Sequence, residues 1–248
     1  AVDEARQRGM FAWIYDEDGW PSGFGGGAVN ALGEEYLQQY ATAEIIPCNG
    51  SVGPKLDRPK YIIAAYATGK KVNGFGDCHR LDPNDLPGSW SRLPATCRER
   101  LVVFRRELHN YRRHFSPEAW ADGYVDVLNP KVTRAFIGKI YEAYRREIGK
   151  AFGGSVPGVF TDEPSYHELG WSEPVVRLPM SPVLEREFEK RYGAPLLDNL
   201  MTIAFGGPEA IRARWCFYSC LAHLFSHNYT RILAEWCQRH KMVFTGHY

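Results

Sequence analysis

The stretch Val156-Pro-Gly-Val-Phe-Thr-Asp-Glu163, followed by Pro164, is the strongest indication in this sequence of the fold and of a functional site. A short apolar run ends in two adjacent carboxylates and a proline, which predicts a buried strand that stops at an acid pair. In parallel α/β folds the carboxyl ends of the strands face the ligand, so a carboxylate placed there points at substrate. Glu163 is therefore the first candidate for a catalytic acid. The alternative is that Asp162 and Glu163 cap a following helix.

Strand geometry predicts that the two acids have different roles. Adjacent residues of a strand point to opposite faces, so only one member of the pair is expected to face a site. Pro164 ends the strand directly after Glu163. We therefore assign Glu163 to catalysis and Asp162 to support and substrate contact.

Helical and strand patterns alternate on both sides of the acid pair, which is typical of a parallel sheet. The predicted strands cover residues 10–15, 156–161 and 242–245, and the predicted helices cover 2–8, 130–151, 181–192 and 209–240. We expect one catalytic α/β domain over residues 1–248, of the (β/α)8 TIM-barrel type. Because fewer than eight strands can be recognised, the barrel is expected to be incomplete, with the remaining domains in a longer polypeptide.

The region from about residue 45 to 107 has a different character. It has strand candidates at 61–67 and 101–104, separated by Gly, Pro, Asp and Asn. Such turn-forming residues indicate an inserted β-rich part. In a barrel, long insertions concentrate on the catalytic side.

Composition narrows the class of function. The net charge of +1 and the scattered basic residues do not favour nucleic-acid binding. Aromatic residues make up 14% of the chain, which favours a carbohydrate ligand because the apolar face of a sugar stacks on such rings.

The six cysteines have no CxxC spacing, so a structural zinc site is not expected. No apolar run approaches the length of a membrane span, and no leader is evident, although export of a processed chain stays open.

A second acid cluster follows the strand at 10–15, in the loop Asp16-Glu-Asp-Gly-Trp-Pro-Ser-Gly-Phe-Gly-Gly-Gly27. Acids at a strand end can hold a hydroxylated ligand, and Trp20 can stack on a sugar ring. We expect Asp16, Asp18 and Trp20 to bind sugar. Glu17 is the candidate second catalytic carboxylate, unless that residue lies beyond Tyr248.

The glycines of this loop do not indicate a nucleotide cofactor. A phosphate loop requires a Lys followed by Ser or Thr, and this pair is absent after Gly27. A dinucleotide fingerprint also fails, because the acidic residues precede the glycines.

Three further polar residues are candidates for substrate contact. His247 follows a glycine at a predicted strand end, Tyr166 comes just after the acid pair, and Asp126 ends a short apolar run. Each is also a common type of structural residue at such positions. Asn129 is most simply the N-cap of the helix that begins at Pro130.

Three strings of the chain resemble a known family. They are Trp13-Ile-Tyr-Asp-Glu-Asp-Gly-Trp-Pro-Ser-Gly23, Gly158-Val-Phe-Thr-Asp-Glu-Pro164 and the closing Phe244-Thr-Gly-His-Tyr248. Together they resemble the barrel domain of glycoside hydrolases in the α-L-rhamnosidase group, family 106. The members of that family are much longer, with further barrel strands and accessory β-domains.

The resemblance implies a function. It implies inverting hydrolysis of a terminal α-L-rhamnoside by two glutamates, assisted by a calcium ion. Carried over by position, it makes Glu163 a catalytic carboxylate and places Asp16, Glu17, Asp18 and Trp20 near the sugar.

Other readings stay open from the residues alone. The chain could be a carbohydrate-binding segment without turnover, or a metal-dependent hydrolase that uses Asp16, Asp162 and His247. Retention and inversion also stay open, because they depend on the separation of two carboxyl groups.

Overall fold

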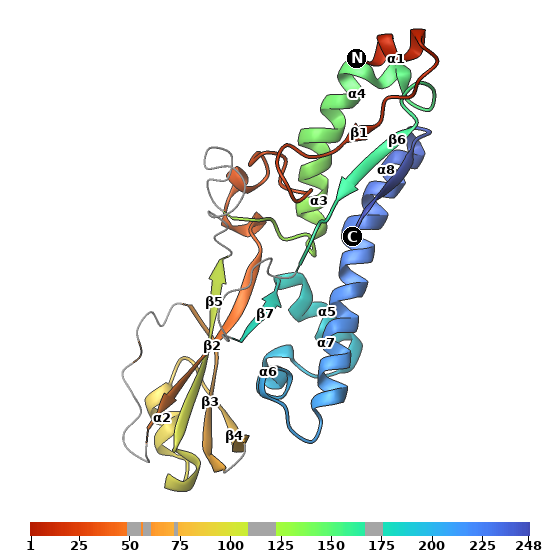
Figure 1. The fold of residues 1–248 in the computed structure, drawn as a ribbon. Helices are drawn as coiled ribbons and strands as arrows, with labels where there is room; N and C mark the ends of the chain where they lie inside the picture. The colour runs from red at the N-terminus through yellow and green to blue at the C-terminus, as the bar shows by residue number, and fades with distance from the viewer. Residues whose placement is uncertain (49–55, 57–60, 72–73, 109–122, 167–175) are drawn as a thin grey trace. The chain divides into compact units, whose positions relative to one another are not determined.

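The computed structural model describes residues 1–248 apart from 49–55, 57–60, 72–73, 109–122 and 167–175 (Figure 1). The chain divides into two compact units. Unit 1 contains Ala1–Gln38, Leu108–Leu169 and Leu221–Tyr248, and unit 2 contains Gln39–Glu107 and Gly170–Cys220. None of the helices among the described residues is both long enough and apolar enough to cross a membrane.

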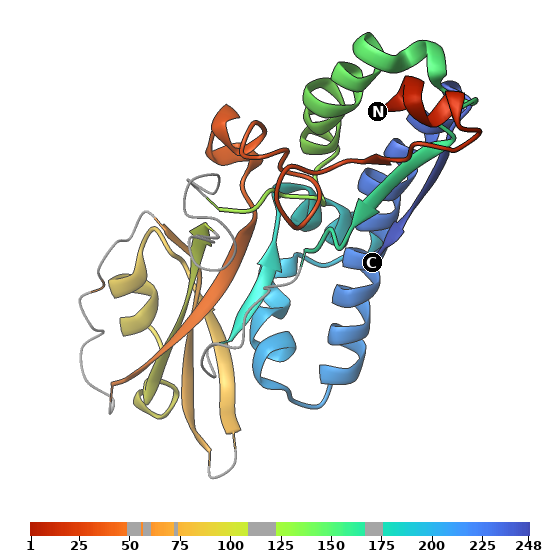
Figure 2. The same cartoon turned by 45° about the horizontal axis from the view of Figure 1, so that its top comes forward.

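Unit 1 is built on a three-stranded parallel sheet. Its strands are β1 (Ile14–Tyr15), β6 (Gly158–Asp162) and β8 (Val243–His247), in the order β1-β6-β8. Figures 1 and 2 show β6 between its two neighbours. Parallel neighbours require a long crossover connection, and in unit 1 the crossovers contain helices.

The helices of unit 1 precede its strands. The short α1 (Val2–Gln7) precedes β1. An almost continuous helical run precedes β6 and consists of α3 (Pro130–Phe136), the π turn η5 (Ile137–Tyr141), α4 (Glu142–Ile148) and the 3-10 turn η6 (Gly149–Ala151). A second run precedes β8 and consists of α7 (Ala210–Phe225), whose residues from Leu221 onward belong to unit 1, the π turn η7 (Ser226–Thr230) and α8 (Arg231–Arg239). The 3-10 turns η1 (Asn30–Leu32) and η2 (Glu34–Tyr36) follow the glycine loop.

Local signals explain where the helical run before β6 begins. The side chain of Asn129 accepts a hydrogen bond from the Lys131 amide at 3.1 Å, and Pro130 takes the first helical position. The predicted N-cap is therefore confirmed.

The core of unit 1 lies between the sheet and these helices. Ile14 and Val159 are buried against it, whereas Trp13 and Tyr15 are 49% and 45% exposed. This alternation follows from the two-residue period of a strand. One face of the sheet therefore packs on the helices, and the other, which we call the open face, is accessible. The helix side of the core contains Phe136, Tyr141, Tyr229, Leu233 and Trp236.

Unit 2 is a five-stranded antiparallel sheet with helices. The strand order is β4 (Gly74–Leu81), β3 (Ile62–Lys71), β5 (Arg100–Leu108), β2 (Gln39–Pro47) and β7 (Arg177–Met180). Its helical segments are α2 (Leu86–Ser91), η4 (Ala95–Cys97), α5 (Pro182–Tyr192), α6 (Leu196–Phe205) and the first part of α7. The region predicted as an insertion at about 45–107 lies in this unit.

The predicted (β/α)8 barrel is wrong. The described residues form a three-stranded parallel sheet and a separate five-stranded antiparallel sheet, with no closed barrel. The physical reason lies in the connections of unit 2, where β3 and β4 are separated by two residues and pair antiparallel. So short a connection cannot supply the crossover that a parallel pair needs. The strands β2, β4 and β7, which complete this sheet, were not predicted from the sequence.

Candidate functional site

The carboxyl ends of the three parallel strands of unit 1 meet at one edge of the sheet. Tyr15 is in register with Phe160, and Asp162 is in register with His247. The acids that follow β1, the acid pair of β6 and the histidine of β8 therefore come together. This is the arrangement that a parallel sheet predicts for residues at its strand ends.

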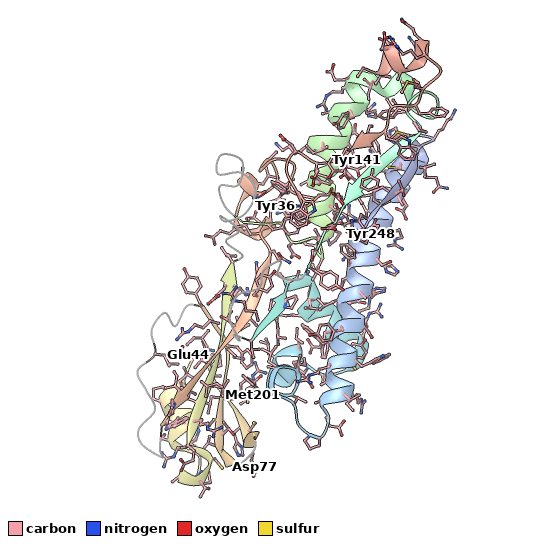
Figure 3. The ribbon with its side chains drawn as sticks, in the orientation of Figure 1. Tyr36, Glu44, Asp77, Tyr141, Met201 and Tyr248 are labelled. Atoms are coloured by element: carbon pink, nitrogen blue, oxygen red, sulfur yellow. The ribbon has the colours of Figure 1, made fainter. Side chains whose placement is uncertain are left out.

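Asp16 lies on the buried side of this edge. Its side chain has no exposed surface and accepts hydrogen bonds from the hydroxyls of Tyr141 at 2.5 Å and Ser22 at 2.7 Å. Burial raises its pKa to about 6, and the hydrogen bonds from these hydroxyls oppose the rise. Tyr141, labelled in Figure 3, comes from η5. Asp16 thus anchors the end of β1 to a helix, and it is fully buried, although we expected it to bind sugar.

Ser22 fastens the acid loop to the acid pair. Its hydroxyl donates to Asp16 and accepts from the Asp162 amide at 2.7 Å, while its own amide donates to the Asp162 carbonyl at 2.8 Å. Its carbonyl in turn accepts from the hydroxyl of Tyr124. The hydroxyl and the backbone amide of Ser22 consequently hold the two acidic segments in a fixed relation.

Glu17 is a partly buried carboxyl group with a raised pKa. Its pKa is raised to about 7, mainly by burial, and the negative charges of Asp162 and Asp16 raise it further, while the nearby Tyr15 hydroxyl lowers it in part. Its Oε2 is shielded from solvent, and no donor within the described part of the chain reaches it. A carboxyl with this pKa carries a proton for a large fraction of the time at neutral pH.

Asp162 lies beside Glu17 and is oriented by Tyr15. The Tyr15 hydroxyl donates to Asp162 Oδ2 at 2.6 Å, and its ring stacks on Phe160 with the centroids 5.9 Å apart. Burial and the neighbouring carboxylates raise the pKa of Tyr15, so this hydroxyl stays a donor.

Glu163 does not follow the alternation of its strand. Its φ of 45° lies in the left-handed region, its amide donates to the His247 carbonyl at 2.8 Å, and its Oε1 lies 2.9 Å from His247 Nδ1. The same nitrogen lies 3.5 Å from Asp162 Oδ1. The expectation that the two acids point to opposite faces is therefore wrong. The left-handed backbone turns Glu163 back toward the imidazole that Asp162 also faces.

The remaining predicted site residues lie in other surroundings. Asp18 is exposed and lies against Gly26 of its own loop, and Trp20 is partly buried before Pro21. Tyr166 packs edge-to-face on Phe225, with the ring centroids 5.4 Å apart.

Asp126 stabilises a turn of the backbone. It is buried, and its Oδ1 accepts from the Leu128 amide at 3.1 Å, which forms an Asx turn before α3.

One group of side chains could hold a metal ion. Ligand atoms of Asp162, Glu163 and His247 lie within 4.8 Å of one another, the only such group in the described part of the chain. Calcium takes oxygen ligands, so a set with an imidazole nitrogen does not by itself fit the calcium ion implied by the family resemblance. Two carboxylates and an imidazole suit zinc or manganese better. Asp16, which the alternative of a metal-dependent hydrolase placed with Asp162 and His247, is not in this group.

Two residues that contact the acids at the strand ends were not predicted from the sequence. Tyr15 could have been found, because strand alternation places it on the same side as Glu17. Ser22 carries no comparable signal, since its contacts join segments 140 residues apart.

Comparisons with protein families and with curated proteins do not assign this chain to a family. Neither a scan against protein-family models nor a search of curated proteins finds a match to this chain.

Asp16 gives a prediction about stability. The pKa of its carboxyl is about 6 in the folded chain against an ordinary 3.8, so the folded state binds this proton more tightly. The resulting stabilisation is fully present below the ordinary pKa and is lost as the pH rises past 6. Wild type should therefore lose about 3 kcal/mol of this stabilisation between about pH 3 and pH 7. Asp16→Asn has no carboxyl group at this position and should not lose it, so over this range its free energy of unfolding should rise relative to that of wild type by the same amount.

Urea denaturation at a series of pH values measures this difference. Asp18→Asn is the matched control, because Asp18 is exposed in the same loop. If the curves of Asp16→Asn and wild type stay parallel over this pH range, the buried carboxyl is not the group that titrates.

Proposed function

We propose that unit 1 hydrolyses a glycosidic bond by acid and base catalysis with two carboxyl groups. The observation that carries the proposal is Glu17, whose pKa of about 7 suits a general acid, at the strand ends where the charge of Asp162 acts on it and where Asp162 and Glu163 both face His247. Glycosidases need one protonated and one ionised carboxyl group on the scissile bond. The sugar is a terminal α-L-rhamnoside or a related deoxy sugar, and this choice rests on the family resemblance of the three sequence strings alone.

Glu17 acts as the acid in this mechanism. A leaving oxygen must receive a proton as the bond to the anomeric carbon breaks. Burial and the two neighbouring negative charges keep a proton on Glu17 near neutral pH, where an unperturbed glutamic acid is ionised.

Glu163 acts as the base, and His247 positions it. The imidazole Nδ1 lies 2.9 Å from Glu163 Oε1, so a proton on this nitrogen would orient that carboxylate oxygen and leave the second one for a water molecule. The backbone contact from the Glu163 amide to the His247 carbonyl holds the two residues together at a second point.

Aromatic side chains of the open face support a carbohydrate ligand. An open cavity of about 440 Å³ on this face is lined by Trp13, Ile14, Tyr15, Phe160 and Thr245. Tyr15 belongs both to this cavity and to the acid group, since its hydroxyl donates to Asp162. Stacking of sugar C–H faces on such rings would place the polar edge of the sugar toward the carboxylates.

Hydrolysis of para-nitrophenyl α-L-rhamnopyranoside tests the proposal. We expect release of nitrophenol by wild type and a fall in kcat of roughly 10²–10⁴-fold for Glu163→Gln, because the glutamine amide cannot take a proton from water. Glu34→Gln is the control, since Glu34 is exposed in η2 of the same unit and should retain full activity.

The other outcomes decide against the proposal. Equal release by wild type and Glu163→Gln would remove Glu163 from the mechanism. If no nitrophenol is released while rhamnose raises the melting temperature of the chain, the function is binding without turnover.

One observation favours a second candidate, a metal-dependent hydrolase. The ligand atoms of Asp162, Glu163 and His247 are close enough together to hold one ion. In that case activity should disappear on treatment with a chelator and return with zinc or manganese. Activity unchanged by the chelator would leave the two-carboxylate mechanism.

A further inference from the structure

A second cavity of unit 1 lies at the opposite ends of the strands. It has a volume of about 760 Å³ and is formed by the end of α4, by η6, and by the residues between α8 and β8. Its lining contains Arg145, Arg146, Lys150, Arg239 and Lys241, against the one acid Glu147. The chain as a whole has a net charge of only +1, so this concentration of positive charge is local.

Most of these cations have no carboxylate partner in the part of the chain that the structure describes. Arg145 pairs with Glu142, with Nε and Oε2 2.5 Å apart. For Arg146, Lys150, Arg239 and Lys241, no carboxylate of the described residues lies within ion-pair distance, and all four side chains are exposed. Like charges in one concave site repel one another and raise its potential.

Helix dipoles account for only part of the cluster. Cations are favoured in the last turn of a helix, which explains Arg146 at the end of α4 and Arg239 at the end of α8. Lys241 lies beyond α8 and has a φ of 60°, where glycine is the usual residue. The chain thus has a lysine at a position where the backbone conformation favours glycine, and the helix dipole does not explain this cation.

Aromatic rings line part of the same cavity. The rings of Phe152 and His240 are perpendicular, with their centroids 6.2 Å apart, and His240 lies over Trp236 at 4.0 Å. His240 Nδ1 is 2.8 Å from the Trp236 carbonyl, a contact that fixes the orientation of the imidazole. The cavity thus combines cations with a partly apolar ring surface.

We propose that this cavity binds a saccharide that carries several anionic groups, such as sulfates. Guanidinium and ammonium groups bind such oxyanions by charge-assisted hydrogen bonds, and the rings accept the apolar face of the sugar. The volume lies within the range of about 300–1,000 Å³ typical of small-ligand sites, which favours a short saccharide over a nucleic acid. The proposal uses none of the acids at the other end of the strands, so it stands or falls independently of the catalytic one.

Calorimetric titration of the whole chain with sucrose octasulfate at low salt tests the site. We expect saturable binding of one ligand per chain, weakened by added salt, and no binding of uncharged sucrose. Arg239→Glu should weaken the affinity at least about tenfold, as expected when a contacting charge is reversed. Arg134→Glu makes the same charge change on an exposed residue of α3 outside the cavity and should leave the affinity unchanged.

Lys241→Gly separates binding from folding. Glycine relieves the left-handed backbone, so the variant should melt no lower than wild type and still bind sucrose octasulfate several-fold more weakly. Equal weakening by Arg134→Glu, or absence of saturable binding, would overturn the proposal. Inorganic sulfate binding as tightly as sucrose octasulfate would overturn the assignment to a saccharide.

Discussion

Glu17→Gln is expected to lower kcat/KM on an unactivated α-L-rhamnoside by roughly 10²–10⁴-fold, the usual contribution of a general acid. Glutamine occupies the same position beside Asp162 but cannot donate a proton to the leaving oxygen. Methyl α-L-rhamnopyranoside is the suitable substrate, with liberated rhamnose as the measurement, because its methoxide leaving group needs that proton.

The identity of the leaving group provides the control for this experiment. A dinitrophenolate leaves without protonation, so on the dinitrophenyl rhamnoside Glu17→Gln should lose far less activity than on the methyl glycoside. Glu163→Gln should lose activity on both substrates, because activation of water is needed in each case. If Glu17→Gln is impaired equally on both substrates, Glu17 is not the acid.

The pH dependence follows from the same residue. The acid form of Glu17 is lost as the pH rises past its pKa of about 7, so the activity of wild type should fall above this pH. In Glu17→Gln the residual rate should not show this alkaline decline.

Phe136→Ala is expected to lower the free energy of unfolding by about 3–5 kcal/mol, the usual cost of removing a large aromatic ring from a core. Phe136 is completely buried in unit 1, and its ring contacts that of Tyr141 edge-to-face, with the centroids 5.6 Å apart. The loss should also weaken the site, since Tyr141 holds Asp16. Urea denaturation followed by circular dichroism measures the change.

Phe11→Ala is the matched control for this substitution. Phe11 belongs to the same unit but is 68% exposed, so removal of its ring should change the free energy of unfolding by less than about 1 kcal/mol. Equal effects of the two substitutions would show that Phe136 does not pack as described.

Local sequence signals predicted much of unit 1. The apolar run before the acid pair became β6, and the helical run from residue 130 to 151 begins at the cap and proline that the sequence contains. Such signals act within a few residues, so they do not depend on the rest of the fold. The predicted strand at 10–15 formed only over Ile14–Tyr15, because a strand also needs a partner along its length.

Long-range pairing could not be predicted. The strand candidates at 61–67 and 101–104 were recognised, but the sequence does not show which strands they pair with. Their antiparallel pairing with each other, and the addition of β2, β4 and β7 to that sheet, gave a fold different from the expected barrel. The register of such strands depends on side chains that are far apart in sequence.

The sequence by itself determined that acids stand at the ends of strands and that those strands have apolar faces. It did so because strand periodicity and proline act locally. Only the tertiary structure decided what each acid does. It buried Asp16 against Tyr141, raised the pKa of Glu17 by burial and by neighbouring charge, and turned Glu163 toward His247 by a left-handed backbone. Burial, charge proximity and backbone strain are properties of packed neighbours, which a linear sequence does not contain.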